Sequence, residues 1–152
     1  MTIDAAPPAV ATDDASPVTV EWRWIAALAT VVLAVLALYC VGVLLPYFVN
    51  GLDRLPLEEV ASGAHDPEDL WPQDMWAGPV GMAGLFSVAF GLIVSLGAVG
   101  VGTAWLASLW RRPGPGRLPK SLTLLVVVAG CVAAVLFQVS ETGAALQAWR
   151  LD

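Results

Sequence analysis

Ile25 to Leu45 read IAALATVVLAVLALYCVGVLL, 21 residues without a charged side chain. A helix of this length rises roughly 30 Å, which is the thickness of the hydrocarbon core of a bilayer. Two further apolar runs follow, from Gly78 to Leu109 and from Ser121 to Val139. Together the runs predict an all-α membrane protein, a three-transmembrane-helix bundle. The polar–apolar alternation of a transmembrane β-barrel is not seen in them.

The composition supports this class. Of the 152 residues 58% are hydrophobic and 13% are charged, whereas soluble domains carry about 25% charged residues. A surface facing water would need more charge than this chain has. Lys120 is the only lysine, and the enrichment in Ala, Val, Gly, Pro and Arg is typical of a bacterial protein from a high-GC genome.

The charges are divided between the two connections. Seven carboxylates and one base, Arg54, lie between the first two runs, and the next connection holds four bases and no acid: Arg111, Arg112, Arg117 and Lys120. Because short loops rich in Lys and Arg stay cytoplasmic, the basic loop is expected inside. The protein is therefore expected in the cell (inner) membrane, multi-pass, with its N-terminus cytoplasmic and its C-terminus outside. Arg23 agrees with this orientation, and Arg150 opposes it.

The predicted organisation follows from these runs and loops. It comprises a disordered cytoplasmic tail (1–22), transmembrane helix 1 (23–49), an acidic extracytoplasmic loop (50–77), transmembrane helix 2 (78–110), a basic cytoplasmic loop (111–119), transmembrane helix 3 (120–141), and an extracytoplasmic tail (142–152) that could extend the third helix. Aromatic residues flank the runs, as expected at membrane–water interfaces: Trp22, Trp24, Tyr47, Trp76, Trp105, Trp110 and Trp149.

The acidic stretch EEVASGAHDPEDLWPQDMW (58–76) contains the only weak candidates for a metal site, namely His65, Asp66, Glu68 and Asp69. Their spacing matches no known ligand motif. A short helical turn explains them as well, with Asp66 as its cap and Pro67 at its first position. We therefore expect no metal and no cofactor. The stretch is interpreted as a solvated acidic collar, with a docking surface for a partner as the alternative.

The second run carries a ridge of small residues at every fourth position: Ala83, Ser87, Gly91 and Ser95. The pairs Ala98–Gly102 and Gly100–Ala104 continue it on neighbouring ridges. Between helices in lipid, association depends on close backbone approach, which small residues at this spacing permit. The ridge predicts helix packing, either within the chain or against another subunit.

Polar residues near the third run are few. Gln138 and Glu141 would share a helix face at three-residue spacing and form a possible polar site. Cys40 and Cys131 are expected to be buried thiols. No catalytic constellation and no phosphate-binding loop is visible, so the chain is not expected to be an enzyme. The chain also lacks a basic face for nucleic acid.

These observations favour a small accessory or scaffolding subunit that packs against a larger membrane complex. The expected partners are membrane lipid and other membrane protein subunits, or further copies of the chain. The alternative is a homo-oligomeric channel or small transporter with Ser95, Gln138 and Glu141 on a pore face. A membrane enzyme that uses His65 and the acids beside it ranks third.

Overall fold

The computed structural model describes residues 20–62, 64–111, 114 and 116–151, and the side chains of Glu68 and of residues 73–77 lie outside this description. The predicted tail (1–22) therefore lies outside it up to residue 19. Throughout the described ranges the secondary structure is helical and contains no strand. Three segments are long and apolar enough to cross a membrane: Trp22–Val49, Gly78–Arg111 and Arg117–Gln138.

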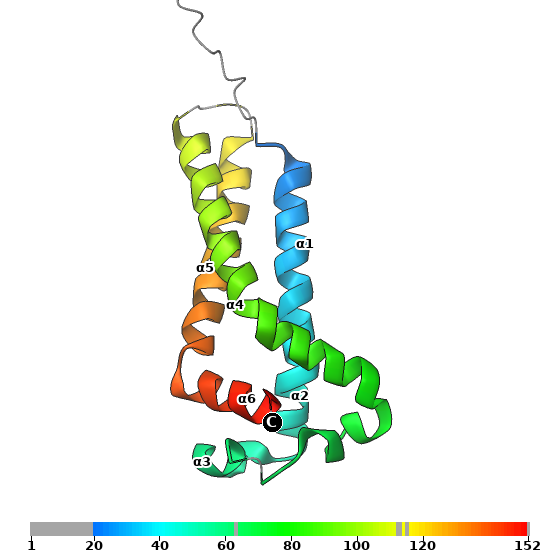
Figure 1. The fold of residues 1–152 in the computed structure, drawn as a ribbon. Coiled ribbons are helices and arrows are strands. Elements are labelled where there is room, and N and C mark those ends of the chain that lie inside the picture. The colour runs from blue at the N-terminus through cyan, green and yellow to red at the C-terminus, as the bar shows by residue number, and fades with distance from the viewer. Residues whose placement is uncertain (1–19, 63, 112–113, 115, 152) are drawn as a thin grey trace, which may run out of the picture.

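The first candidate span is built from three helical pieces (Figure 1). It comprises α1 (Trp22–Tyr39), a π-helical stretch η1 (Cys40–Leu44) and α2 (Leu45–Val49). Pro46 has no N–H to donate to the carbonyl of Gly42, so the regular α-helical ladder is interrupted there. A π-turn is one way for a helix to absorb such an interruption. The span stays continuous, but its backbone changes geometry over η1.

The acidic connection folds into three short turns: η2 (Leu52–Arg54), α3 (Leu57–Val60) and η3 (Pro67–Asp69). The turn predicted after Asp66 is confirmed as η3, where the Asp69 amide donates to the Asp66 carbonyl at 3.2 Å. The next helix, α4 (Gln73–Arg111), begins five residues before the expected boundary at 78 and has Pro79 inside it. In Figure 1 its first part crosses the first span obliquely and its second part runs beside α5.

The third apolar helix, α5 (Arg117–Gln138), follows Gly116, whose φ of 73° lies in the left-handed region that glycine adopts without strain. It ends three residues before the predicted boundary at 141. The chain then turns into α6 (Glu141–Leu151), which lies across the end of the bundle (Figure 1). The tail is thus a separate helix, and the expected extension of the third helix is wrong.

Two features of the turn explain this break. The Ser140 hydroxyl donates to the Phe137 carbonyl at 2.6 Å and accepts from the Gly143 amide at 3.2 Å, so it caps α6. A side-chain carbon at Gly143 would collide with the Phe137 carbonyl. Glycine at this position lets α6 fold back closely against the end of α5.

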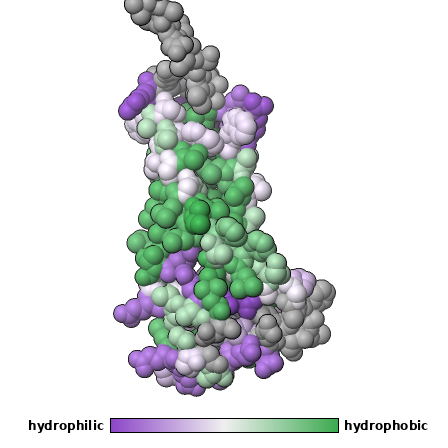
Figure 2. Space-filling view, in the orientation of Figure 1, coloured by the Kyte–Doolittle hydropathy of each residue, from purple (hydrophilic) through white to green (hydrophobic). Residues whose placement is uncertain are grey.

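Buried apolar residues form one large cluster at the α6 end of the bundle: Tyr39, Val43, Tyr47, Leu52, Val60, Val88, Leu146 and Trp149. Smaller clusters lie along the spans around Leu124 and Cys131. Figure 2 shows apolar residues around the middle of the visible face and hydrophilic ones gathered toward its ends. The large cluster binds the acidic connection and α6 to the spans as one cap at this end of the bundle (residues 50–62, 64–72 and 141–151). We call it the outer cap, after the side on which the sequence analysis expects the acidic connection.

Candidate functional site

The small-residue ridge of α4 faces the interior of the chain. Ser87 is 1% exposed and Ser95 4%, Gly91 is buried, and Ala83 is half-buried. A side-chain carbon at Gly91 would lie 3.3 Å from Nε2 and 3.4 Å from Oε1 of Gln138. The amide of Gln138 therefore rests directly on the ridge. The partner of this ridge is the chain itself.

A second close approach joins α4 to the first span. A side-chain carbon at Gly42 would lie 2.5 Å from Gly84 Cα and would collide with the Gly84 nitrogen. In the other direction, a carbon at Gly84 would lie 2.8 Å from the Gly42 carbonyl oxygen. Both positions must be glycine for the backbones to cross at this distance.

The other small pairs of α4 point in two directions. Ala98 is 3% exposed and Gly102 is buried, where a side-chain carbon at Gly102 would reach 2.5 Å from a methyl of Val128 on α5. Around Gly97 and Gly100 a side-chain carbon would meet open space, and Ala104 is exposed. The Ala98–Gly102 pair therefore packs inside the bundle, and the Gly100–Ala104 pair lies on its outside.

Gln138 and Glu141 do not share a face, because the chain turns between them at Val139–Ser140. Gln138 is 8% exposed and inside the bundle, whereas Glu141 is exposed at the start of α6. The pore face considered for Ser95, Gln138 and Glu141 would need all three on one surface. Ser95 and Gln138 are instead covered by the chain's own helices.

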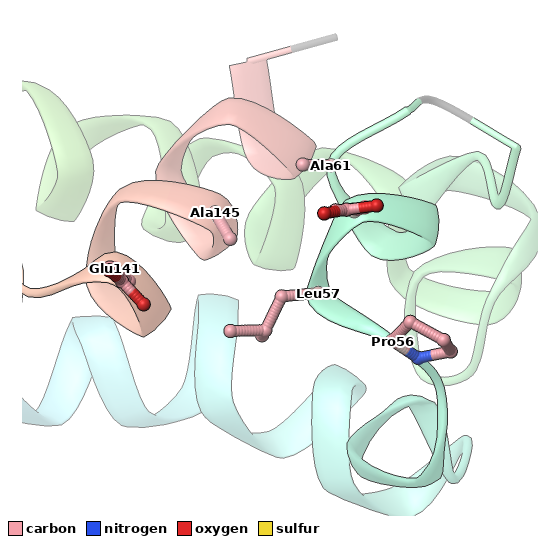
Figure 3. A pocket seen from close by; sticks show the side chains of 6 residues that line it. Pro56, Leu57, Ala61, Glu141 and Ala145 are labelled. Atoms are coloured by element: carbon pink, nitrogen blue, oxygen red, sulfur yellow. The ribbon is translucent and has the colours of Figure 1, made fainter.

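Glu141 borders a shallow hollow of about 540 Å³ between α3 and α6 (Figure 3), lined by Pro56, Leu57, Glu58, Ala61, Glu141 and Ala145. Leu57 reaches from α3 toward α6 in this view. Two carboxylates, Glu58 and Glu141, give the hollow a negative edge. Both are exposed, so water solvates their charge.

The metal candidates are dispersed. His65 Nε2 lies 3.5 Å from Glu59 Oε1, while Asp66 and Asp69 are exposed and the side chain of Glu68 is outside the description. Across the described ranges, no group of three or more His, Cys, Asp or Glu side chains comes close enough to hold a metal ion. The His65 carbonyl has a structural role, since it accepts a hydrogen bond from Trp149 Nε1 at 2.8 Å.

Two buried polar residues were not predicted as site residues. Arg150, 6% exposed, donates from Nη2 to the Gly81 carbonyl at 2.9 Å, and its guanidinium occupies the space that glycine leaves at position 84. Tyr39, 6% exposed, packs edge-on against Phe137 with 6.2 Å between ring centroids. The sequence feature that could have identified Tyr39 was a phenol side chain inside an apolar run. For Arg150 the signal was a single base in the C-terminal tail, which the sequence analysis expected outside, where bases are scarce.

Comparison of the chain with protein-family models, curated proteins and solved structures finds no match.

Proposed function

We propose that the protein is an integral membrane protein of the bacterial inner membrane that serves as an accessory or scaffolding subunit of a larger membrane complex. Three helices of spanning length and high mean hydropathy, 2.7, 2.2 and 2.3, support insertion in the bilayer. Between 17% and 33% of the most apolar part of each helix is buried within the chain. The remaining apolar surface is available to lipid and to partner helices.

The observation that carries the subunit role is one continuous outward stripe on α4. Its residues recur at alternating spacings of four and three and are all exposed: Phe86, Phe90, Ile93, Gly97, Gly100, Ala104 and Ala107. The first half is bulky, with Phe86 and Phe90 stacked at 5.8 Å between centroids, and the second half is small. Small residues on an exposed helix face let a second helix approach closely, which lipid-facing surfaces do not require.

The proposed occupant of the stripe is a transmembrane helix of a partner subunit. Such a helix would lay its own bulky side chains over Gly97 and Gly100, where a side-chain carbon meets open space. Its association would come from van der Waals contact, since lipid and protein are equally apolar there. The inward ridge at Ser87–Ser95 is already covered and is not part of this surface.

The proposed orientation places the α4–α5 connection in the cytoplasm. Arg117 stacks over Trp110 at 4.5 Å, and Lys120 Nζ donates to the Val20 carbonyl at 2.9 Å, so basic groups and the start of the first span meet at one end. The outer cap lies at the opposite end (Figure 1). A cationic loop on the cytoplasmic side agrees with the positive-inside rule.

Affinity capture of the tagged full chain from membranes in mild detergent, followed by mass spectrometry, tests the subunit role. We expect stoichiometric partner subunits with the natural chain, and their loss with Gly100→Leu. Gly130→Leu is the matched control, because Gly130 is also helical and open to the surroundings but lies on α5. Capture of the natural chain alone, or equal loss with both variants, would contradict the proposal.

The orientation is tested separately by cysteine labelling of intact cells. A cysteine placed next to Asp69 should react with an impermeant reagent from outside, and one placed next to Arg117 should react only after lysis. Labelling of both from one side would overturn the orientation.

A further inference from the structure

Two polar atoms lie buried where α1, α4, α5 and α6 meet. The Tyr39 hydroxyl and the Gln138 side-chain carbonyl Oε1 are both inaccessible to solvent, and neither has a hydrogen-bond partner among the described residues. Their side chains are 6% and 8% exposed. Leaving such groups unsatisfied in an apolar medium is costly, so buried polar groups in proteins nearly always have a partner.

The two residues belong to one junction. The ring of Tyr39 packs against Phe137, the residue before Gln138, and Tyr39 shares an apolar cluster with Val88 of α4. Val88 lies less than one helical turn from Gly91, on which the Gln138 amide rests. Side chains from α1 and α5 thus converge on the same part of the α4 ridge.

Three polar side chains near the junction donate to main-chain carbonyls. The Ser87 hydroxyl donates to the Gly84 carbonyl at 2.8 Å, and Gln147 Nε2 donates to the main-chain carbonyl of Gln138 at 3.0 Å. The indole of Trp149 donates to the His65 carbonyl. Within the described residues no donor, the Tyr39 hydroxyl included, reaches Gln138 Oε1, so a small bound molecule would supply the hydrogen bond that this carbonyl lacks.

The space restricts the size of that molecule. One methyl group at Gly91 would already stand 3.3–3.4 Å from the Gln138 amide, which is a tight contact. A ligand must be small, must donate to a carbonyl and must hydrogen-bond a phenol. Water meets all three requirements, and it commonly satisfies buried polar groups in this way.

We propose that this junction is a water-binding site inside the apolar bundle, in which Gln138 Oε1 and the Tyr39 hydroxyl hold ordered water. The site lies beneath α6, where Leu146 is 1% exposed and Gln147 bonds to Gln138. Water there is separated from the bulk by the outer cap. The inference is independent of the subunit role, since it concerns the interior of the chain.

Water-edited solid-state NMR of the isotopically labelled full chain in lipid bilayers tests the site directly. Magnetisation from water should reach the side chains of Gln138 and Tyr39 faster than those of Val43 and Leu146. These two controls belong to the large apolar cluster at the same end of the bundle and are 0% and 1% exposed. Transfer to Gln138 and Tyr39 at the slow rate of both controls would overturn the proposal.

Thermal stability gives a second, independent readout. If water satisfies these groups, Gln138→Leu and Tyr39→Phe should each lower the melting temperature, by about 2–4 °C for one lost hydrogen bond. Tyr47→Phe is the matched control, since Tyr47 is equally buried at 6% but its hydroxyl is not among the buried atoms without a partner. A rise in melting temperature with both test variants would show that the groups are buried dry, and would refute the site. If a variant fails to fold, the NMR measurement on the natural chain still decides.

Discussion

Replacing Gly42 with alanine tests whether the backbones of the first span and α4 cross as closely as the structure indicates. The added carbon would stand 2.5 Å from Gly84 Cα, whereas ordinary van der Waals contact begins at 3.4 Å. To restore ordinary contact with Gly84 Cα, the helices would have to separate by about 0.9 Å along this line. Because the obstructing atoms are backbone, no side-chain rotation can relieve the clash.

The expected cost can be estimated with a matched control. Overpacking of a well-packed interior costs about 1–3 kcal/mol, while alanine has a higher helix propensity than glycine by about 0.8–1.0 kcal/mol. Gly130→Ala is the same substitution in a helix but without a clash, because a carbon at Gly130 meets open space. The difference in free energy of unfolding between the two variants isolates the steric cost, and we expect about 1–3 kcal/mol.

Thermal unfolding of both variants in the same detergent, followed by circular dichroism, is the measurement. At this chain length each kcal/mol corresponds to about 2–4 °C in melting temperature. Gly42→Ala should melt below Gly130→Ala by a corresponding margin. Equal melting temperatures would mean that the helices do not approach through Gly42 and Gly84, and the described packing of α4 on the first span would have to be abandoned.

Two further predictions concern the outer cap. Ser140→Ala removes the hydroxyl that caps α6 through the Gly143 amide. Amide hydrogen exchange in the first turn of α6 should accelerate, because losing the cap costs about 0.5–2 kcal/mol of helix stability. Unchanged exchange in that turn would rule out the cap. Trp149→Phe keeps an aromatic ring in a fully buried position but removes the donor to the His65 carbonyl. The carbonyl left without its donor costs about 1–3 kcal/mol, so limited proteolysis between Val60 and Leu70 should become faster. Cleavage as slow as in the natural chain would count against docking of the acidic connection through this hydrogen bond.

Much of the fold was predictable from the sequence because it depends on run length and polarity. The three apolar runs predicted three long helices, and these are present with ends within five residues of the expected boundaries. The turn after Asp66 followed from local chain chemistry, since proline sets the backbone angle and short polar residues favour a helical start. Features of this kind depend on a few neighbouring residues, so they can be predicted without knowing which distant residues are in contact.

The candidate site was predicted in part. The small-residue ridge was identified from its four-residue spacing, but the spacing could not say whether Ser87–Ser95 or Gly100–Ala104 faces the chain's own helices. Gln138 was noted as polar, yet it was grouped with Glu141 on a face that the turn at Ser140 removes. Tyr39 and Arg150 gained their roles from helices distant in sequence.

The amino-acid sequence by itself determined that the chain forms three long apolar helices with acidic and basic connections at different places, because the period and length of apolar runs are properties of neighbouring residues. Only the tertiary structure decided that the tail folds back as α6, that Gly42 faces Gly84, and that the Gln138 amide is turned inward onto Gly91. The contacts of Gly42 with Gly84 and of Gln138 with Gly91 join residues dozens of positions apart, and these residues meet only when the helices rotate and cross in one particular way. The turn into α6 depends on nearer residues, since Ser140 and Gly143 pack against Phe137, but the apolar pattern alone does not show it. The pattern of apolar residues does not specify how each helix is rotated, and the packing between helices does.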